Sequence, residues 1–369
     1  MRRFWNVACA LLAAAALASC GGGSDDASVS DARDVAPGSL AAIAQLDGNA
    51  LPAWTVDSSV VADNVHNVYY LAGEPAFLSS SDLRVVRIDA NGKVTPVAGP
   101  WNNAPAICQQ LGGCPTARIA TDRSGNLYVF WTAAPPTGVP TIYKLDSSGN
   151  VLSTLELKDL VPSYSIGTVS YHYRFGDRGS APPMAVDRQG NVLIFDGEGA
   201  LWRIGLDGAA KSLAGQDYFG TPQDGIGSNA RFRFSSASIT TDDAGNVYVP
   251  DGQSIRKVTP AGVVTTIPVS GTMATGTDAG GNIYVVQNSL CSGQTVAPSG
   301  ELRTIVFKSS NDAVLCQRDT SIAAFAMTPH GVVAVSFDKV VSPLEGGAFV
   351  DGAFVPAPPS GALLLFAGF

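Results

Sequence analysis

The chain has 369 residues, of which 46% are hydrophobic and only 15% are charged. Soluble domains usually carry about 25% charged residues, so this composition argues against a disordered chain, a coiled coil or a nucleic-acid-binding protein. The net charge of −8 supports the last exclusion, because it repels phosphate backbones. The length accommodates about two domains, or one large all-β barrel or ring with many turns.

Residues 1–19 have the composition of a secretory signal peptide. Arg2 and Arg3 form a basic start, and the apolar run Val7–Ala18 is too short to span a bilayer comfortably. The run ends in Leu-Ala-Ser-Cys at residues 17–20, which resembles the lipobox of bacterial lipoproteins. The resemblance implies cleavage before Cys20, lipidation of Cys20 and export to the bacterial cell envelope. A glycine rather than Asp after the cysteine implies the outer membrane, on its periplasmic or surface face. A cysteine placed here by chance is the alternative.

Residues 20–40 are predicted to be the lipidated cysteine and a flexible linker, because they are rich in Gly, Ser and Asp. No later apolar stretch has spanning length, so the lipid is the predicted membrane attachment. Residues 41–369 are predicted to form one folded domain.

Cysteine usage indicates an oxidising compartment. Cys9 lies in the signal peptide and Cys20 is the predicted lipidation site, which leaves Cys108, Cys114, Cys291 and Cys316. Four cysteines allow three pairings. The short spacing of Cys108 and Cys114 also fits half of a metal site, but no His or second Cys pair lies near it. We predict the disulfides Cys108–Cys114 and Cys291–Cys316.

Five segments share a phrase in which Asp begins a turn, Asn ends it and an apolar run follows; four of them also have Gly before the Asn, and the more divergent segment 62–70 has His66 there. They are residues 62–70, 120–129, 186–194, 241–249 and 277–285, and a sixth segment, 327–335, keeps only the glycine. Asp can bond the backbone two residues on, and Gly tolerates a positive φ. The apolar, β-branched run is typical of a strand buried on both faces.

Each phrase is followed by a second turn with its own glycine and another strand. These glycines are Gly92, Gly149, Gly208, Gly262, Gly300 and Gly361. Six units of four antiparallel strands predict an all-β fold, a six-bladed β-propeller. Alignment on the glycines makes the residues after Gly361 the fourth strand of the last unit. Ring closure rests either on packing between whole blades or on a strand from residues 40–56.

This pattern resembles the NHL-repeat family of six-bladed propellers. The resemblance covers roughly residues 55–369 and is clearest in the fourth unit, at residues 225–232, 242–251 and 255–262. NHL-like propellers include zinc lyases, and neighbouring six-bladed families include calcium-dependent lactonases. The resemblance therefore keeps an enzyme of the lyase or lactonase type, with its site at the mouth of the ring, as an alternative.

The meander sorts the connections onto two faces of the ring. The two short hairpin turns of every unit lie on one face, which we call the turn face. The other, which we call the loop face, carries the long segments 99–115, 133–140, 157–183, 215–233, 286–294 and 337–350. All four remaining cysteines are on the loop face, with Cys291 and Cys316 in neighbouring loops. Variable loops on a rigid scaffold are where binding usually occurs.

The loop face holds the candidate ligand-binding residues. They are Tyr164, Tyr171, Tyr173, Arg174, Asp177 and Arg178 in one loop, Tyr218 and Phe219 in the next, and Asp196 and Asp251 at strand ends. Tyr and Arg on rigid loops suit recognition of sugars, peptides or proteins. In the alternative, the aromatic residues only pack the loops onto the ring, and the two Asp residues cap the connections that follow them.

The same sorting argues against a metal enzyme. A catalytic zinc needs about three protein ligands, but His66 and His330 fall on the turn face and His172 on the loop face. The Asp-x-x-Gly-Asn phrases lack the glutamate of a calcium loop and are interpreted as structural turns. No Gly-x-Ser-x-Gly elbow and no assignable carboxylate pair occurs.

The predicted function is a non-catalytic binding or scaffold module for an envelope protein, peptide or glycan. No metal, cofactor or nucleic acid is expected. A purely structural lipoprotein is the remaining alternative.

Overall fold

The computed structural model describes the chain over a set of ranges in its repeat region. They are residues 40–46, 54–63, 67–73, 84–89, 93–98, 117–131, 140–157, 164–166, 169–171, 182–196, 199–216, 220–233, 238–252, 254–269, 273–277, 281–286, 292–306, 322–328, 331–337, 347–350, 353–356 and 361–367. Within them the chain forms β-strands and the short 3-10 helix η3 (Gly227–Asn229), in agreement with the predicted all-β class. No helix in these ranges is long and apolar enough to cross a membrane.

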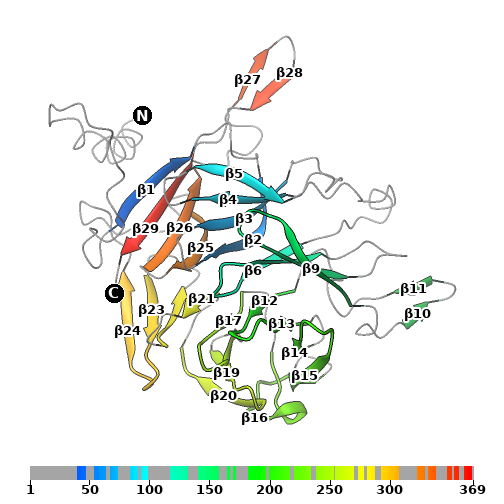
Figure 1. Ribbon diagram of the computed structural model, residues 1–369. Coiled ribbons are helices and arrows are strands. Elements are labelled where there is room, and N and C mark those ends of the chain that lie inside the picture. Colours follow the sequence, from blue (N-terminus) through cyan, green and yellow to red (C-terminus); the bar gives the residue numbers. More distant parts are fainter. Residues whose placement is uncertain are drawn as a thin grey trace.

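Five antiparallel sheets are built from consecutive strands, as the repeat units predict (Figure 1). Blade 1 contains β2 (Trp54–Ala62), β3 (Val68–Gly73), β4 (Arg84–Ile88) and β5 (Val94–Ala98). Blade 2 contains β6 (Ala117–Thr121), β7 (Leu127–Trp131), β8 (Thr141–Leu145) and β9 (Val151–Glu156). Blade 3 contains β12 (Met184–Val186), β13 (Val192–Phe195), β14 (Ala200–Ile204) and β15 (Ala210–Gly215).

Blade 4 has one strand more than the repeat predicts. It contains β17 (Thr240–Thr241), β18 (Val247–Pro250), β19 (Ile255–Val258) and β20 (Val263–Ile267), with β16 (Gly225–Ile226) on the outer side of β20. Blade 5 contains β21 (Met273–Thr277), β22 (Ile283–Val286), β23 (Ser292–Val296) and β24 (Leu302–Val306).

The sixth unit is not built on this plan, so the structure has five blades of the expected kind where six were predicted. Its place is taken by a four-stranded sheet in the order β25 (Ile322–Thr328), β26 (Gly331–Phe337), β29 (Gly361–Ala367), β1 (Leu40–Leu46). The predicted fourth strand, β29, pairs directly with β26 along its whole length. The prediction was wrong because the residues expected between them form a separate hairpin of β27 (Gly347–Val350) and β28 (Ala353–Pro356), which projects outward (Figure 1).

Strand β1 resolves the question of ring closure. It pairs with β29 in antiparallel fashion, with Leu40 opposite Phe366 and Leu46 opposite Gly361. Without β1, β29 would be an edge strand with a row of unpaired backbone groups. Of the two closures that the sequence left open, the structure uses the strand from residues 40–56.

The first strands of the sheets surround a common centre. Strand β2 contacts β6, β6 contacts β12, β12 contacts β17, β17 contacts β21, β21 contacts β25, and β25 contacts β2. This closed cycle of contacts is the arrangement of a β-propeller. The second strands β7, β13 and β18 are buried at every residue, as the apolar runs predict. Their side chains form apolar clusters that join each blade to the next.

The repeated Asp holds the first turn of four blades. The backbone N–H of Asn126 donates to Asp122 Oδ1 at 2.9 Å, and Asn126 Nδ2 donates to Oδ2 at 2.8 Å. The same two bonds join Asp63 to Asn67, Asp187 to Asn191 and Asp242 to Asn246. The carboxylate oxygens are thus used within the turn, which confirms the interpretation of these phrases as structural turns.

A tyrosine completes the turn in three blades. The hydroxyl of Tyr248 donates to Asp242 Oδ2 at 2.8 Å, and Tyr69 and Tyr128 donate to the matching Asp in blades 1 and 2. Burial raises the pKa of Tyr248, and the hydrogen bond to Asp242 and its negative charge raise it further. The hydroxyl therefore stays protonated and remains a donor.

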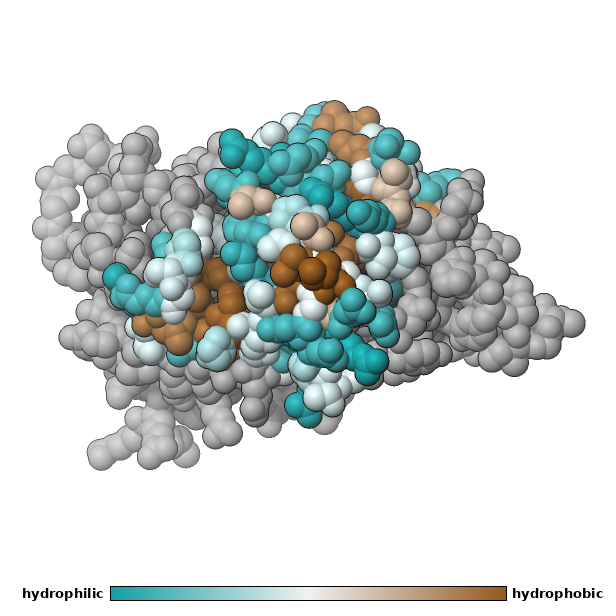
Figure 2. All heavy atoms as spheres, turned by 90° about the horizontal axis from the view of Figure 1, so that it is seen from below, coloured by the Kyte–Doolittle hydropathy of each residue, from teal (hydrophilic) through white to brown (hydrophobic). Residues whose placement is uncertain are grey.

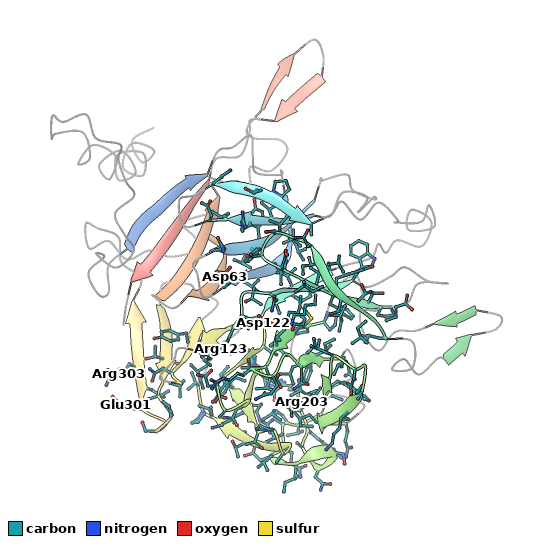
Figure 3. The ribbon with its side chains drawn as sticks, viewed as in Figure 1. Asp63, Asp122, Arg123, Arg203, Glu301 and Arg303 are labelled. Atoms are coloured by element: carbon teal, nitrogen blue, oxygen red, sulfur yellow. The ribbon has the colours of Figure 1, made fainter. Side chains whose placement is uncertain are left out.

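Neighbouring blades are also joined by hydrogen bonds near the turn face. Thr121 Oγ1 donates to the carbonyl oxygen of Ala62 at 2.7 Å, and Thr241 Oγ1 donates to that of Val186 at 2.9 Å. Arg123, in the first turn of blade 2, forms an ion pair with Asp243 in the first turn of blade 4. This pair links two blades that are not neighbours in the sequence. In Figure 3 Arg123 lies toward the middle of the molecule.

Second turns pack against the outer strand of the preceding blade. A Cβ atom on Gly149 would overlap the backbone of Val97 in β5, and one on Gly262 would overlap that of Leu213 in β15. Both residues have a positive φ, of 89° and 79°. Glycine is therefore needed here both for the turn and for the approach of two blades.

Candidate functional site

Most of the predicted binding residues lie outside the described ranges. This holds for Tyr173, Arg174, Asp177, Arg178, Tyr218 and Phe219, for Cys20, for Cys108, Cys114, Cys291 and Cys316, and for His66, His172 and His330. Tyr164 and Tyr171 are opposite each other in the two-stranded sheet of β10 (Tyr164–Ile166) and β11 (Val169–Tyr171). Figure 1 shows this hairpin outside the ring. Asp196 and Asp251 are the predicted site residues whose surroundings are described.

Asp196 and Asp251 follow the second strands of blades 3 and 4, and each is only 2% exposed. The backbone N–H of Ala200 donates to Asp196 at 2.8 Å, and the indole N–H of Trp202 donates to it at 2.7 Å. The backbone N–H of Arg233 donates to Asp251 at 2.7 Å. Both carboxylates therefore hold the chain around them, which supports the capping role that was the alternative to a binding role.

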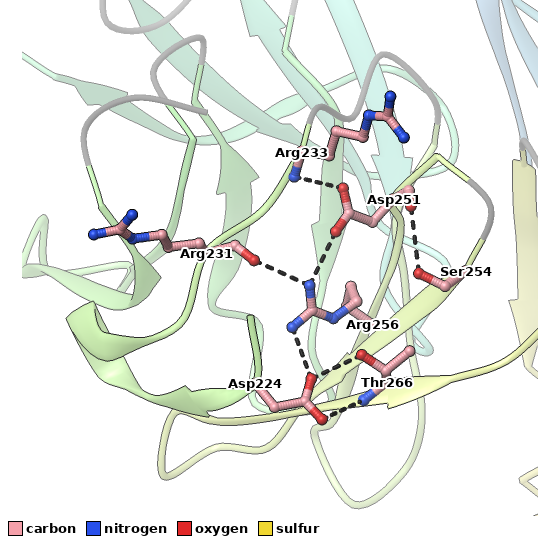
Figure 4. A network of polar contacts seen from close by, with 7 residues as sticks. All are labelled: Asp224, Arg231, Arg233, Asp251, Ser254, Arg256 and Thr266. Atoms are coloured by element: carbon pink, nitrogen blue, oxygen red, sulfur yellow. Dashed lines mark hydrogen bonds and ion pairs between the residues drawn. The ribbon is translucent and has the colours of Figure 1, made fainter. Parts of the chain in front are cut away.

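Asp251 belongs to a larger polar network around Arg256 of β19 (Figure 4). The guanidinium donates to Asp251 Oδ2 at 3.0 Å, to the carbonyl oxygen of Arg231 at 3.0 Å and to Asp224 Oδ1 at 2.8 Å. Arg256 is fully buried. Its charge lies 5.5 Å from the centroid of the Phe232 ring, a separation at which a cation is attracted to an aromatic face.

Asp224 joins the network to the outer strand of blade 4. Its carboxylate accepts hydrogen bonds from the hydroxyl of Thr266 at 2.8 Å and from the Thr266 backbone N–H at 3.2 Å. Partial burial alone would raise the pKa of Asp224, but the hydrogen bonds from Thr266 and the charge of Arg256 outweigh it and lower the pKa. The carboxylate is therefore ionised at neutral pH and neutralises part of the buried charge.

The network fixes the connection between blades 3 and 4. Gly225 and Ile226 of this connection form β16 on β20, and Arg256 and Asp251 hold its return at Arg231 and Arg233. The buried side chain of Phe232 packs edge-on against Phe195 of blade 3, with ring centroids 5.1 Å apart. The connection is thus a wedge between two blades, bound to both.

The sequence predictions did not include Arg256. The signal in the sequence was a charged residue within the strand Ile-Arg-Lys-Val at 255–258, between apolar residues that are buried at both ends of the strand. A buried charge is tolerated only when it is paired and hydrogen-bonded, so such an arginine calls for acidic partners nearby. Asp224 and Asp251 supply them.

The pH dependence of stability should reflect the lowered pKa of Asp224. A carboxylate with a lowered folded-state pKa stabilises the fold above its unfolded pKa of about 3.9, and this contribution disappears as the pH falls through the folded value. We expect the melting temperature of the protein to exceed that of Asp224→Asn by a constant margin at neutral pH, and by a shrinking margin below about pH 4. Thermal unfolding from pH 7 to pH 2.5 measures it. A margin that is independent of pH would contradict the ionic role.

In the part of the chain that the structure describes, no three His, Cys, Asp or Glu side chains are grouped so that they could hold a metal ion. Asp196 and Asp251 at strand ends, and Asp122 in a first turn, accept hydrogen bonds from nearby donors. These carboxylates therefore stabilise the turns and connections in which they lie.

No family model matches the chain. It is 26% identical to Teneurin-3 of Mus musculus over 230 residues, which are 60% of this chain and only 8% of Teneurin-3. A virginiamycin B lyase from Staphylococcus aureus is 11% identical, over 88% of this chain and 99% of its own, with a TM-score of 0.45. A protein of unknown function from Bacteroides caccae is 17% identical, over 66% and 78%, with a TM-score of 0.39. These similarities assign no activity to this chain.

Proposed function

We propose that this protein is a lipid-anchored, NHL-like propeller of the bacterial cell envelope that binds a protein, peptide or glycan on its loop face without catalysing a reaction. Cys20 carries the lipid, residues 21–39 are the linker, and the long connections of the ring form the binding surface. The Leu-Ala-Ser-Cys sequence at 17–20 supports the anchor.

The observation that most favours binding over catalysis is the network of Arg256. It uses two buried charged groups, Arg256 and Asp251, and the exposed carboxylate of Asp224 to hold a connection between blades in one conformation. Loops that are ordered before binding lose less conformational entropy when a partner arrives. A loop face whose charges stabilise its own connections is suited to recognition.

The test is a pull-down from envelope extract with the full chain as bait. We expect the triple variant Tyr171→Ala, Tyr173→Ala and Arg174→Ala to lose a partner that the unchanged protein retains, with an unaltered melting temperature. The matched control, Arg188→Ala with Gln189→Ala, changes two exposed residues of a turn-face turn and should retain the partner. Equal capture by both variants would contradict binding through this loop.

Two further measurements separate the proposal from its alternatives. The variant Cys20→Ser should lose incorporation of radiolabelled palmitate and leave the membrane fraction; continued sedimentation with membranes would contradict the lipid anchor. Metal analysis of the purified protein should find no stoichiometric ion. Zinc or calcium at one equivalent, removable by a chelator with loss of an enzymatic activity, would instead support a lyase or lactonase.

A further inference from the structure

The outer edges of the blades differ in how they are protected against pairing with other chains. An exposed edge strand is a template for a further strand, and proteins block it with Pro, with charged residues or by covering it. The outer strands β5, β15 and β24 each carry one such exposed residue: Pro96, Lys211 and Arg303, respectively. The outer strand β20 is covered by β16. Strand β9 of blade 2 has no Pro and no basic residue, its one charged residue, Glu156, is at its end, and none of the described strands covers it.

Strand β9 is exposed along almost its whole length. Val151 is 59% exposed and Leu152 is 54% exposed, and Ser153, Thr154 and Glu156 are exposed as well. Among the described strands its substantial contact is with β8 alone. Its pairing has a register shift at Leu152, but β5 and β15 have such shifts too and carry a Pro or a Lys in addition. Figure 2 shows groups of apolar residues among hydrophilic ones on the face seen from below.

Blade 4 shows what covers this position within the same molecule. Val264 of β20 and Val151 of β9 occupy equivalent positions in the repeat. Val264 pairs with Val258, the last residue of β19, and Val151 pairs with Leu145, the last residue of β8. The backbone of Val264 pairs with Gly225 of β16, and its side chain packs in the apolar cluster with Leu213 and Phe232, so Val264 is only 1% exposed, against 59% for Val151. Asp224 accepts the next free edge donor, the backbone N–H of Thr266. A short extended segment is thus sufficient to cover the edge of an outer strand.

We propose that β9 is an interaction edge that takes an extended segment of a partner protein as an additional antiparallel strand. Backbone hydrogen bonds at Thr154, whose N–H and C=O face away from β8 in this register, would supply affinity, and apolar side chains against Val151 and Leu152 would supply specificity. The net charge of −8 favours a neutral or basic segment. This surface is on the rim of the ring, so it is separate from the loop face and depends on neither the lipid nor the loop-face partner.

The test is site-specific photo-crosslinking in cells that produce the full chain. The photoreactive residue p-benzoylphenylalanine replaces Leu152 in one variant and Thr154 in another, and the adducts are mapped by mass spectrometry. We expect both to react with the same segment of one protein, with the adduct of position 154 nearer the amino end of that segment. Only an antiparallel strand gives this reversed order. The same probe at Leu206, which is 50% exposed in a turn, should not mark that segment.

A charge variant supplies the matched control. Ser153 pairs with Lys144 as Lys211 pairs with Arg203, so Ser153→Lys gives β9 the protection that β15 already has. It should lower the crosslinking yield about tenfold, whereas Ser212→Lys in β15 should leave it unchanged. Absence of an adduct, adducts in parallel order, or a yield insensitive to Ser153→Lys would overturn the proposal. An adduct between two copies of β9 would overturn it in favour of self-association.

Discussion

Replacing Gly149 by alanine is expected to lower the free energy of unfolding by about 3 kcal/mol. The residue has φ +89°, a conformation that costs an L side chain about 1 kcal/mol or more. The added Cβ would also overlap the backbone of Val97 in blade 1. Backbone held in a strand cannot yield as a flexible side chain does, so two blades would have to separate. Unfolding in urea, followed by tyrosine and tryptophan fluorescence, measures the loss.

Gly300 is the matched control for this substitution. It occupies the same place in the second turn of blade 5 with φ +87°, but nothing lies within 4 Å of the added Cβ. The variant Gly300→Ala should therefore lose only the conformational cost of about 1 kcal/mol. If the two variants are equally destabilised, the close approach of blades at Gly149 is not important for stability.

Replacing Arg256 by methionine is expected to destabilise the protein by about 3–5 kcal/mol, because breaking a buried ion pair leaves its partner charged and uncompensated. Asp251, which is 2% exposed, would lose its buried cation, and the carbonyl oxygen of Arg231 would lose a donor. The connection between blades 3 and 4 should loosen at the same time. Hydrogen exchange at the amides of 223–233 would detect that change together with the shift in urea midpoint.

Two comparisons make this result specific. Arg303→Met removes an exposed ion pair with Glu301 and should cost less than about 1 kcal/mol. In Figure 3 this pair lies on the outer side of the ring. The double variant Arg256→Met with Asp251→Asn should recover part of the loss, since it leaves no unpaired buried charge. Arg256→Met as mild as Arg303→Met would show that the network is not needed for stability.

Local chemistry made much of the fold predictable. Asp, Gly and Asn at fixed spacing specify a tight turn, and an apolar run after them specifies a strand buried on both faces. The structure realises both in the turn of Asp122 and Asn126 and in the buried strand β7. The part played by Tyr128 was not predicted, because its hydroxyl reaches Asp122 only when the strand after the turn folds back beside it.

The sequence was least informative where long-range pairing decides the outcome. Because β29 follows a turn glycine, the repeat pattern predicted it to be the outer strand of its sheet. No local sequence feature distinguishes such an outer strand from one that pairs with a further strand, as β29 does with β1. Arg256 shows the same limit for the site. Its partners Asp251 and Asp224 precede it by 5 and 32 residues in the sequence, and only the wrapped connection between blades 3 and 4 brings the more distant Asp224 to it.

The pairing of β1 with β29 sets an order on how the ring can form. Strand β1 is synthesised before the blades, but its pairing partner β29 is synthesised after them, because Leu40 pairs with Phe366. The sheet that contains both strands therefore forms only after β29 has been made. The blades between them rely on local contacts and can assemble early, whereas this contact of very high sequence separation belongs to the slow, late stage of folding. Until then the outer side of β29 is an open edge, exposed to aggregation. The folding chain is thus most vulnerable to aggregation just before β1 pairs with β29.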